Sequence, residues 1–313
     1  MRLKLVPSQT TFNFMRHHKL ALIFSSFLVA ASIGLFALLG LNLGIDFKGG
    51  ILIEARHNAG PADIATVRQR LQQLDLGDVS LQGFGAETDI LLRVQRQAGD
   101  EQAQIAAIEK IGQTLGQNYD IRRTEFVGPT VGAELAEKGI LAVVSAILAI
   151  MVYIWFRFEW QFSIAAIIAL SHDVLSTVGL FALVRFEFNL ATVAAILTIA
   201  GYSINDTVVV FDRAREEMRR YNERPVIDVL NIALNRTLSR TLMTSLTTLL
   251  ALLALFAFGP LVIRDFTIAL MWGVVIGTYS SLFFATPLLV VMGLSARAFD
   301  KKIVDDDEDD YAA

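Results

Sequence analysis

Six apolar runs restrict what this chain can fold into. They lie near residues 20–41, 138–156, 162–184, 189–211, 241–258 and 266–293. Each is close to the roughly 17–25 residues that an α-helix needs to cross about 30 Å of hydrocarbon. Hydrophobic residues make up 54% of the chain and charged residues only 19%, which is more apolar than a soluble domain. The sequence therefore predicts an integral membrane protein with a bundle of six transmembrane helices, one at 20–41 and five within 136–294.

The distribution of arginine between the loops predicts how these helices are oriented. Segment 212–240, between the fourth and fifth runs, is rich in arginine, whereas the loops at Arg185 and Arg264 carry one arginine each. The positive-inside rule places an arginine-rich loop in the cytoplasm. Because the number of helices is even, the N-terminal residues 1–19 and the acidic tail 295–313 are then expected in the cytoplasm as well.

Between the first and second runs lies a polar segment, residues 42–135, which this orientation places outside the cytoplasm. Its pattern changes between the alternation typical of strands and the spacing typical of helices. The expected elements are strands at 51–56, 79–85, 89–96 and 119–128 and helices at 61–74 and 101–116. This β-α-β-β-α-β order is that of a ferredoxin-like α+β domain. The segment has no nucleophile beside a histidine and no cluster of metal ligands, so we expect a recognition or lever domain, not an enzyme.

Two glycine-containing motifs join this segment to the neighbouring helices: GIDFKGG at 44–50 and GPTVG at 128–132. Glycine and proline interrupt regular structure, and proline is well tolerated in the first turn of a helix. Both motifs are read first as structural boundaries, with a hinge as the alternative. The hinge residues would be Gly49, Gly50, Gly128, Pro129 and Gly132.

Polar residues inside the apolar runs are the strongest functional signal. A carboxylate at membrane depth costs on the order of 2.5–3.5 kcal/mol, so Asp206, preceded by Asn205 in the fourth run, requires an explanation. Thr198, Tyr202 and Asp206 recur every four residues, and Ser203 lies three residues before Asp206. This spacing predicts a polar stripe on one face of the fourth helix.

A second polar stripe is expected on the fifth run, where Arg240 and Thr244 are four residues apart. Asp206 and Arg240 are then either a structural ion pair or a pair that handles protons. A buried pair adds little stability, because desolvation offsets the attraction. A carboxylate whose proton affinity responds to a nearby arginine is what a proton-driven machine needs, which favours the second hypothesis.

For two further features inside the apolar runs we favour helix packing over a functional role. His172 and Asp173 in the third run are either a second relay or a hydrogen-bonded contact between helices, with packing favoured. The motif GVVIG at 273–277 is a small-xxx-small match, which indicates close helix packing.

Several functional classes are disfavoured. No GxxxxGK[ST] phosphate loop occurs, so an ion gradient is expected to supply energy in place of ATP. The chain has no cysteine, which excludes disulfides and thiolate metal sites, and neither a metal nor another cofactor is expected. With a net charge of only −4, a nucleic acid partner is not expected either.

Six motifs occur in order along the chain: GIDFKGG, EFVGPTVG, WFRFEW at 155–160, SHDV at 171–174, GYSINDTVVVFDRARE and NRTLSRTLMTSLTT. Together they resemble the SecF family of bacterial protein-export membrane proteins, within the resistance-nodulation-division superfamily. The resemblance runs from the first apolar run to the end of the sixth. It implies a subunit of the bacterial inner membrane, with residues 42–135 in the periplasm.

The resemblance also implies partners and roles. Such a subunit pairs with SecD, associates with the SecYEG channel and often YajC, and uses proton flow to pull or hold the translocating polypeptide. The family residues implicated in proton transport correspond to Asp206 and Arg240. An aspartate beside Asn205 and Ser203 suits sodium as well as a proton, and it is the resemblance that favours protons. Supporting roles are expected for Ser203, Asn205, Thr244, His172 and Asp173. Two other hypotheses stay open: a scaffold that transports nothing, and half of a small-molecule exporter. For such an exporter the polar part of the external segment, about 80 residues at 45–128, is small.

Overall fold

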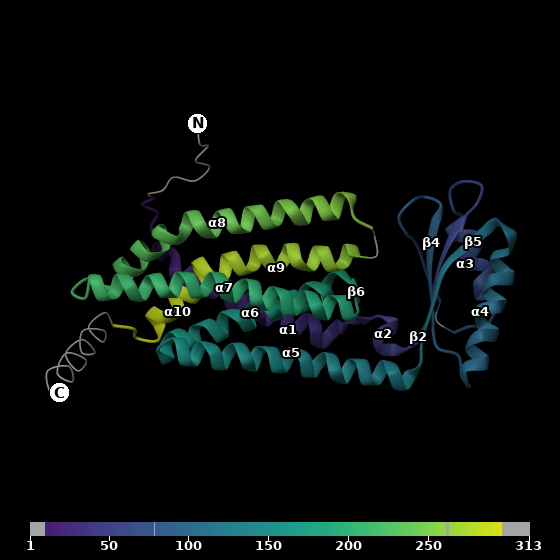
Figure 1. The fold of residues 1–313 in the computed structure, drawn as a ribbon, viewed down its shortest axis with the longest axis horizontal. Helices are drawn as coiled ribbons and strands as arrows, with labels where there is room; N and C mark the ends of the chain where they lie inside the picture. The colour runs from purple at the N-terminus through teal and green to yellow at the C-terminus, as the bar shows by residue number, and fades with distance from the viewer. Residues whose placement is uncertain (1–9, 78, 261–262, 296–313) are drawn as a thin grey trace, which may run out of the picture.

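The computed structural model describes residues 10–77, 79–260 and 263–295 (Figure 1). Within them, six helical spans are long and apolar enough to cross a membrane, which confirms the predicted number. The helices are α1 (His18–Leu39), α5 (Pro129–Arg157), α6 (Trp160–Val184), α7 (Leu190–Arg220), α8 (Val226–Phe258) and α9 (Arg264–Phe283). The 3-10 turn η1 (Phe14–His17) precedes α1, and α10 (Ala285–Val291) extends the span of α9. The predicted acidic tail lies outside the described residues, apart from its first position.

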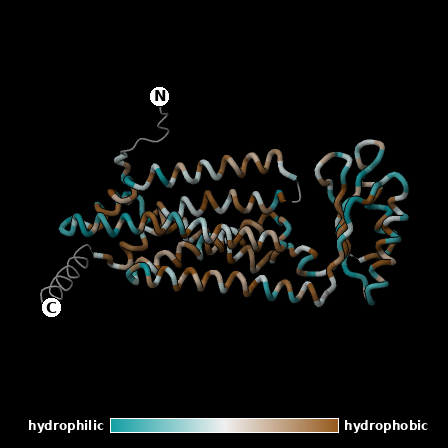
Figure 2. The backbone as a smooth tube through the Cα atoms, viewed as in Figure 1, coloured by the Kyte–Doolittle hydropathy of each residue, from teal (hydrophilic) through white to brown (hydrophobic). Residues whose placement is uncertain are grey.

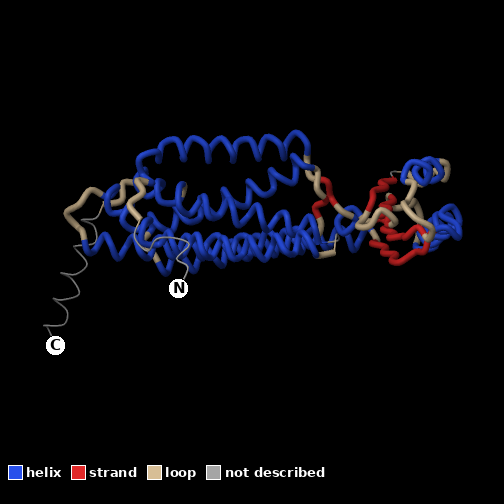
Figure 3. The backbone as a smooth tube through the Cα atoms, turned by 90° about the horizontal axis from the view of Figure 1, so that it is seen from above, coloured by secondary structure: helices blue, strands red, loops and turns tan. Residues whose placement is uncertain are grey.

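The six helices lie side by side in one bundle, and an α+β domain stands at one end of it (Figures 1 and 3). Hydrophobic residues run along the helices, whereas hydrophilic residues gather at the far end of α7 and in the α+β domain (Figure 2). The spans of α6, α7 and α9 are the most buried, and those of α1, α5 and α8 are mostly exposed. The outer helices are therefore free to contact lipid or another membrane subunit.

The structure differs from the prediction in the segment 212–240, which was expected to be a loop. Helix α7 continues to Arg220 and α8 begins at Val226, so only five residues connect them. Buried residues at four-residue spacing, Val210, Ala214 and Met218, continue the inward face of α7 beyond the apolar run. Charged residues cover the rest of the surface, and this amphipathic pattern explains why the helix extends past the membrane-length segment.

The α+β domain has the predicted order of elements. They are β2 (Gly50–His57), α3 (Ile64–Gln72), β3 (Val79–Gly83), β4 (Asp89–Val94), α4 (Glu101–Leu115), the 3-10 turn η2 (Gly116–Asn118) and β5 (Tyr119–Val127). The strands form an antiparallel sheet in the order β3-β4-β2-β5. Helices α3 and α4 lie on the side of the sheet away from the bundle (Figure 1). Alternate strand residues such as Ile51, Ile53 and Leu92 are completely buried in the domain core, as expected for strands with one covered face.

The segments that join domain and bundle are ordered by contacts with the start of α7. Strand β1 (Asn42–Leu43) pairs in parallel with β6 (Glu187–Phe188), and α2 (Ile45–Lys48) follows β1. The Asp46 carboxylate accepts a hydrogen bond of 2.9 Å from the main-chain N–H of Leu190, the first residue of α7. The linker is therefore attached to the helix that carries Asp206.

The predicted hinge glycines occupy this junction. Gly49 and Gly50 have φ values of 72° and 139°, which favour glycine. Gly128 caps α5 and Pro129 is its first residue, as predicted for a boundary. A Cβ on Gly132 would lie 3.0 Å from the main-chain oxygen of Phe47, so this glycine lets α5 approach the linker closely.

An ion pair bridges the domain and the bundle. The Arg93 guanidinium on β4 contacts the Glu187 carboxylate on β6, and the Glu187 N–H lies 3.4 Å from a carboxylate oxygen of Asp265 on α9. Burial lowers the pKa of Arg93, and the Asp265 carboxylate opposes that effect. A cavity of about 560 Å³ lies beside the pair, between the uncovered face of the sheet and the end of the bundle.

Candidate functional site

Asp206 lies at the contact between α7 and α8 and is only 7% exposed. The Thr241 hydroxyl on α8 donates a hydrogen bond of 2.8 Å to its Oδ1. Its Oδ2 is buried and has no hydrogen-bond partner among the described residues. Buried polar atoms without partners are uncommon and costly, so this oxygen marks Asp206 as a site where a proton or another group can bind.

Arg240 is exposed and makes no ion pair with Asp206 in the part of the chain that the structure describes. The two residues still interact electrostatically. Arg240 lines an open cavity of about 410 Å³ between α5, α7 and α8. The other lining residues are Tyr153, Arg157, Val208, Val209, Asp212, Arg213, Glu216, Arg236 and Thr237. The Arg240 guanidinium is therefore close enough to interact with Asp206 electrostatically, and it can change its position within the open cavity or contact another subunit there.

The polar residues of α8 that face α7 each lie one position after the predicted ones in the sequence. Thr237, Thr241 and Ser245 are buried at four-residue spacing, whereas Arg240 and Thr244 are exposed. Thr244 donates a hydrogen bond of 2.9 Å to the main-chain oxygen of Thr241. Thr241, which the sequence interpretation missed, lies next to Arg240 in the chain, and a rotation of about 100° per residue separates their faces.

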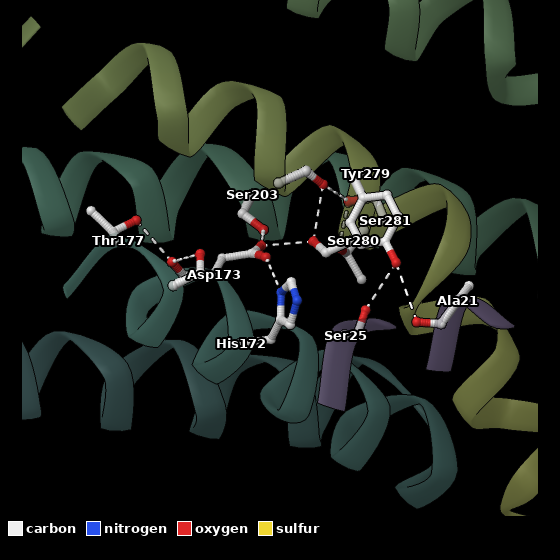
Figure 4. A network of polar contacts seen from close by, with 12 residues as sticks. Ala21, Ser25, His172, Asp173, Thr177, Ser203, Tyr279, Ser280 and Ser281 are labelled. Carbon is white, nitrogen blue, oxygen red and sulfur yellow. Dashed lines mark hydrogen bonds and ion pairs between the residues drawn. The ribbon is translucent and has the colours of Figure 1, made fainter. Parts of the chain in front are cut away.

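The predicted supporting residues divide into two groups. Ser203, expected beside Asp206, instead donates a hydrogen bond to the Asp173 carboxylate on α6. His172 lies beside Asp173, with its Nδ1 2.8 Å from Asp173 Oδ1. Asn205 is exposed on the opposite side of α7 from this group. His172 and Asp173 are thus brought together with Ser203 (Figure 4), whereas Asp206 binds Thr241 on α8.

Helices α7 and α9 approach closely through the GVVIG motif. A Cβ on Gly277 would lie 3.1 Å from the Cβ of Ser203, and one on Gly273 would overlap the side chain of Ile199. The motif therefore packs α9 against α7 within one chain, in agreement with the packing interpretation.

Metal ligands are not gathered anywhere in the described ranges. No group of three or more histidine, cysteine, aspartate or glutamate side chains there is arranged to hold a metal ion. The chemistry available at Asp206 is that of a carboxylate, a hydroxyl donor and a nearby guanidinium.

Comparison with known protein families identifies the chain. Residues 107–295 match the family model for the protein export membrane protein SecD/SecF, C-terminal, and residues 34–56 match the SecD/SecF GG motif. The chain is 42% identical to protein translocase subunit SecF of Rickettsia felis, over 97% of this chain and 98% of that one. It is 49% identical to protein translocase subunit SecF of Magnetococcus marinus, over 92% of this chain and 94% of that one.

Longer relatives contain this unit as a part. The chain is 42% identical to protein translocase subunit SecDF of Brucella abortus, matching 96% of this chain but only 39% of that one. The crystal structure of SecDF from Thermus thermophilus, a translocon-associated membrane protein, superposes with a TM-score of 0.82 at 33% identity. That match covers 92% of this chain and 39% of the other. The chain therefore belongs to the SecD/SecF family of protein-export membrane proteins, and the relatives that it matches from end to end are SecF subunits of the protein translocase.

Proposed function

We propose that this chain is the SecF subunit of a proton-driven accessory complex of the Sec translocase. With SecD it uses the proton motive force to promote translocation and release of secreted polypeptides on the periplasmic side. The observation that supports this most strongly is Asp206, a buried carboxylate inside the bundle. One of its oxygens accepts a hydrogen bond, and the other has no partner within the part of the chain that the structure describes.

The geometry of Asp206 suits reversible protonation. The free Oδ2 can take a proton without breaking the bond that Thr241 donates to Oδ1. When the carboxylate is ionised, Arg240, which precedes Thr241 on α8, can approach it from the open cavity. Protonation removes the attraction between the two groups, so each proton transfer changes the force between α7 and α8. This is an expected mechanism for converting proton flow into helix movement.

The contacts at the other end of α7 provide a route from the membrane to the α+β domain. Asp46 binds the first N–H of α7, and the Asn189 side chain forms a capping box with Thr192 at the same end. Movement of α7 therefore acts directly on the linker that leads into the domain. The strand order of the domain supports a ferredoxin-like lever that stands in the periplasm, with the glycine segments at 49–50 and 128–132 as its hinges.

The partner assignment rests on the fused relatives and on the exposed faces. This chain matches about two fifths of a SecDF protein, so the remainder of such a protein includes the SecD part. On α7, the exposed residues Thr198, Gly201 and Asn205 form a polar and small-residue face that lipid would solvate poorly. We assign this face to SecD, and the complex to the bacterial inner membrane with both termini in the cytoplasm. SecYEG and YajC are the further partners of the proposal.

Asp206→Asn tests the proposal, because asparagine keeps the shape of the side chain but cannot titrate. We expect completion of secretory-protein translocation to be lost in cells, with unchanged membrane levels of this chain and of SecD. The matched control is Asp228→Asn, the same change at an exposed carboxylate in the first turn of α8, which is expected to export normally. Normal export by Asp206→Asn would contradict the proton-driven function and favour a scaffold role.

A further inference from the structure

A second polar cluster is enclosed in the centre of the bundle, apart from the Asp206 contact. Asp173 and His172 on α6, Ser203 on α7 and Ser280 on α9 are each at most 1% exposed. The cluster reaches α1 through Tyr279, whose hydroxyl lies 3.1 Å from Ser25 Oγ and 3.2 Å from the main-chain oxygen of Ala21 (Figure 4). These seven residues lie on four helices, which is more than the packing of two helices requires.

Three side chains contact the Asp173 carboxylate, and two of them, Ser203 and Ser280, donate hydrogen bonds from their hydroxyl groups. His172 Nδ1 lies 2.8 Å from Oδ1, Ser280 Oγ lies 2.7 Å from Oδ2, and Ser203 Oγ also donates to Oδ2. Both carboxylate oxygens of Asp173 therefore have hydrogen-bond partners on neighbouring side chains. Unlike Asp206, Asp173 has a partner at each oxygen, and these contacts join α6 to α7 and α9.

The cluster fixes the segment of α7 that carries Asp206. Ser203 lies three residues before Asp206, which is about 4.5 Å along the helix axis. On the other side, the Thr207 hydroxyl lies 2.9 Å from the Ser281 hydroxyl of α9. Asp206 is therefore bracketed by two buried contacts that hold α7 against α6 and α9 while its own side chain points to Thr241 on α8. Rotation of α7 about its axis would break both contacts and turn the carboxylate away from α8.

We propose that Asp173 is a positioning residue for proton transfer at Asp206: through its hydrogen bond to Ser203, it sets the rotation of α7 and so the direction of the Asp206 carboxylate. His172 acts in the same unit by binding the second oxygen of Asp173. The inference rests on the proposed function, because it concerns the proton chemistry of Asp206. It assigns a positioning role to a residue that lies outside the contact between Asp206 and Thr241.

Titratable groups beside Asp173 and around the cavity that Arg240 lines can also influence a pH profile. They are His172 on α6, Tyr279 on α9, Arg236 and Arg240 on α8, Tyr153 and Arg157 on α5, and Asp212, Arg213 and Glu216 on α7. The test therefore changes hydroxyl groups, which alter the contacts of Asp173 without adding or removing a charge.

The experiment compares proton flux across a pH series in liposomes that contain this chain with its SecD partner, normalised to the amount of protein. Ser203→Ala and Ser280→Ala each remove one donor from Asp173. We expect the midpoint of the pH profile to move by about 0.4–1.2 pH units, the range that corresponds to one hydrogen bond between helices in a membrane. Thr267→Val is the matched control, because the buried Thr267 hydroxyl on α9 donates its hydrogen bond to the main-chain oxygen of Ile263, the residue that caps the same helix. Its midpoint is expected to equal that of the wild type.

The outcomes separate this inference from the proposed function. Asp206→Asn is measured in the same assay, and flux that keeps its pH dependence in that variant would refute the proposed function. If Asp206→Asn abolishes the flux while both serine variants keep the wild-type midpoint, only the positioning role of Asp173 is wrong. Asp173→Asn provides an independent variant, and it is expected to displace the midpoint as well.

Discussion

The Arg93–Glu187 ion pair is predicted to hold the α+β domain against the bundle, and breaking it should release the domain. We choose Arg93→Met, which keeps the apolar stem of the side chain but removes its charge. The variant also leaves Glu187 and Asp265 near each other without the cation between them. We therefore expect Arg93→Met to release the domain more than Glu187→Gln does, because Asp265 still balances part of the charge of Arg93 in the second variant.

The magnitude follows from the burial of the pair. The side chains of Arg93 and Glu187 are 22% and 11% exposed, which places the pair between a surface pair and a fully buried one. Exposed pairs contribute about 0–1 kcal/mol, and breaking a buried pair costs about 3–5 kcal/mol. We expect about 2 kcal/mol for Arg93→Met, which is roughly a 30-fold change in the ratio of docked to undocked domain. A domain docked about 99% of the time would then be docked about 77% of the time.

The assay is a distance measurement between two spin labels. Because the chain contains no cysteine, introduced cysteines at exposed Gln113 on α4 and exposed Phe258 at the end of α8 can be labelled uniquely. Arg93→Met is expected to add a broad population of altered distances. The matched control is Arg122→Met, which breaks an ion pair to Asp120 whose side chains are 49% and 58% exposed and is expected to change nothing. The same distance distribution in wild type and Arg93→Met would refute the reasoning.

Two further predictions concern the helix contacts. Thr241→Val removes the hydroxyl that binds Asp206 at nearly constant volume. The loss of about 0.6–1.7 kcal/mol should reduce proton-coupled export roughly 3- to 18-fold at a pH near the midpoint. Unchanged export at every pH would contradict a role for this bond. Gly273→Val places a side chain where α7 and α9 touch, and overpacking should destabilise the bundle by about 1–3 kcal/mol. We expect a lower thermal midpoint in detergent. An unchanged midpoint would show that the contact is loose.

The lengths of the apolar runs and the spacing of apolar residues can be read from the sequence alone, and they determined the number of spans and the order of elements in the α+β domain. The six spans follow from apolar runs long enough for a membrane, and the β-α-β-β-α-β order follows from changes of period along 50–127. The importance of Asp206 also follows from the sequence, because a carboxylate inside an apolar run is costly wherever the run packs.

Tertiary structure decided which neighbour each polar residue meets. Adjacent positions of a helix differ by about 100° in direction, so the sequence cannot tell whether Arg240 or Thr241 faces α7 until the packing of the two helices is known. Ser203 and Asp206 differ by about 60°, and this small rotation directs one to α6 and the other to α8. The partners of a side chain depend on contacts between distant segments, and these are set by how the whole bundle fills its interior.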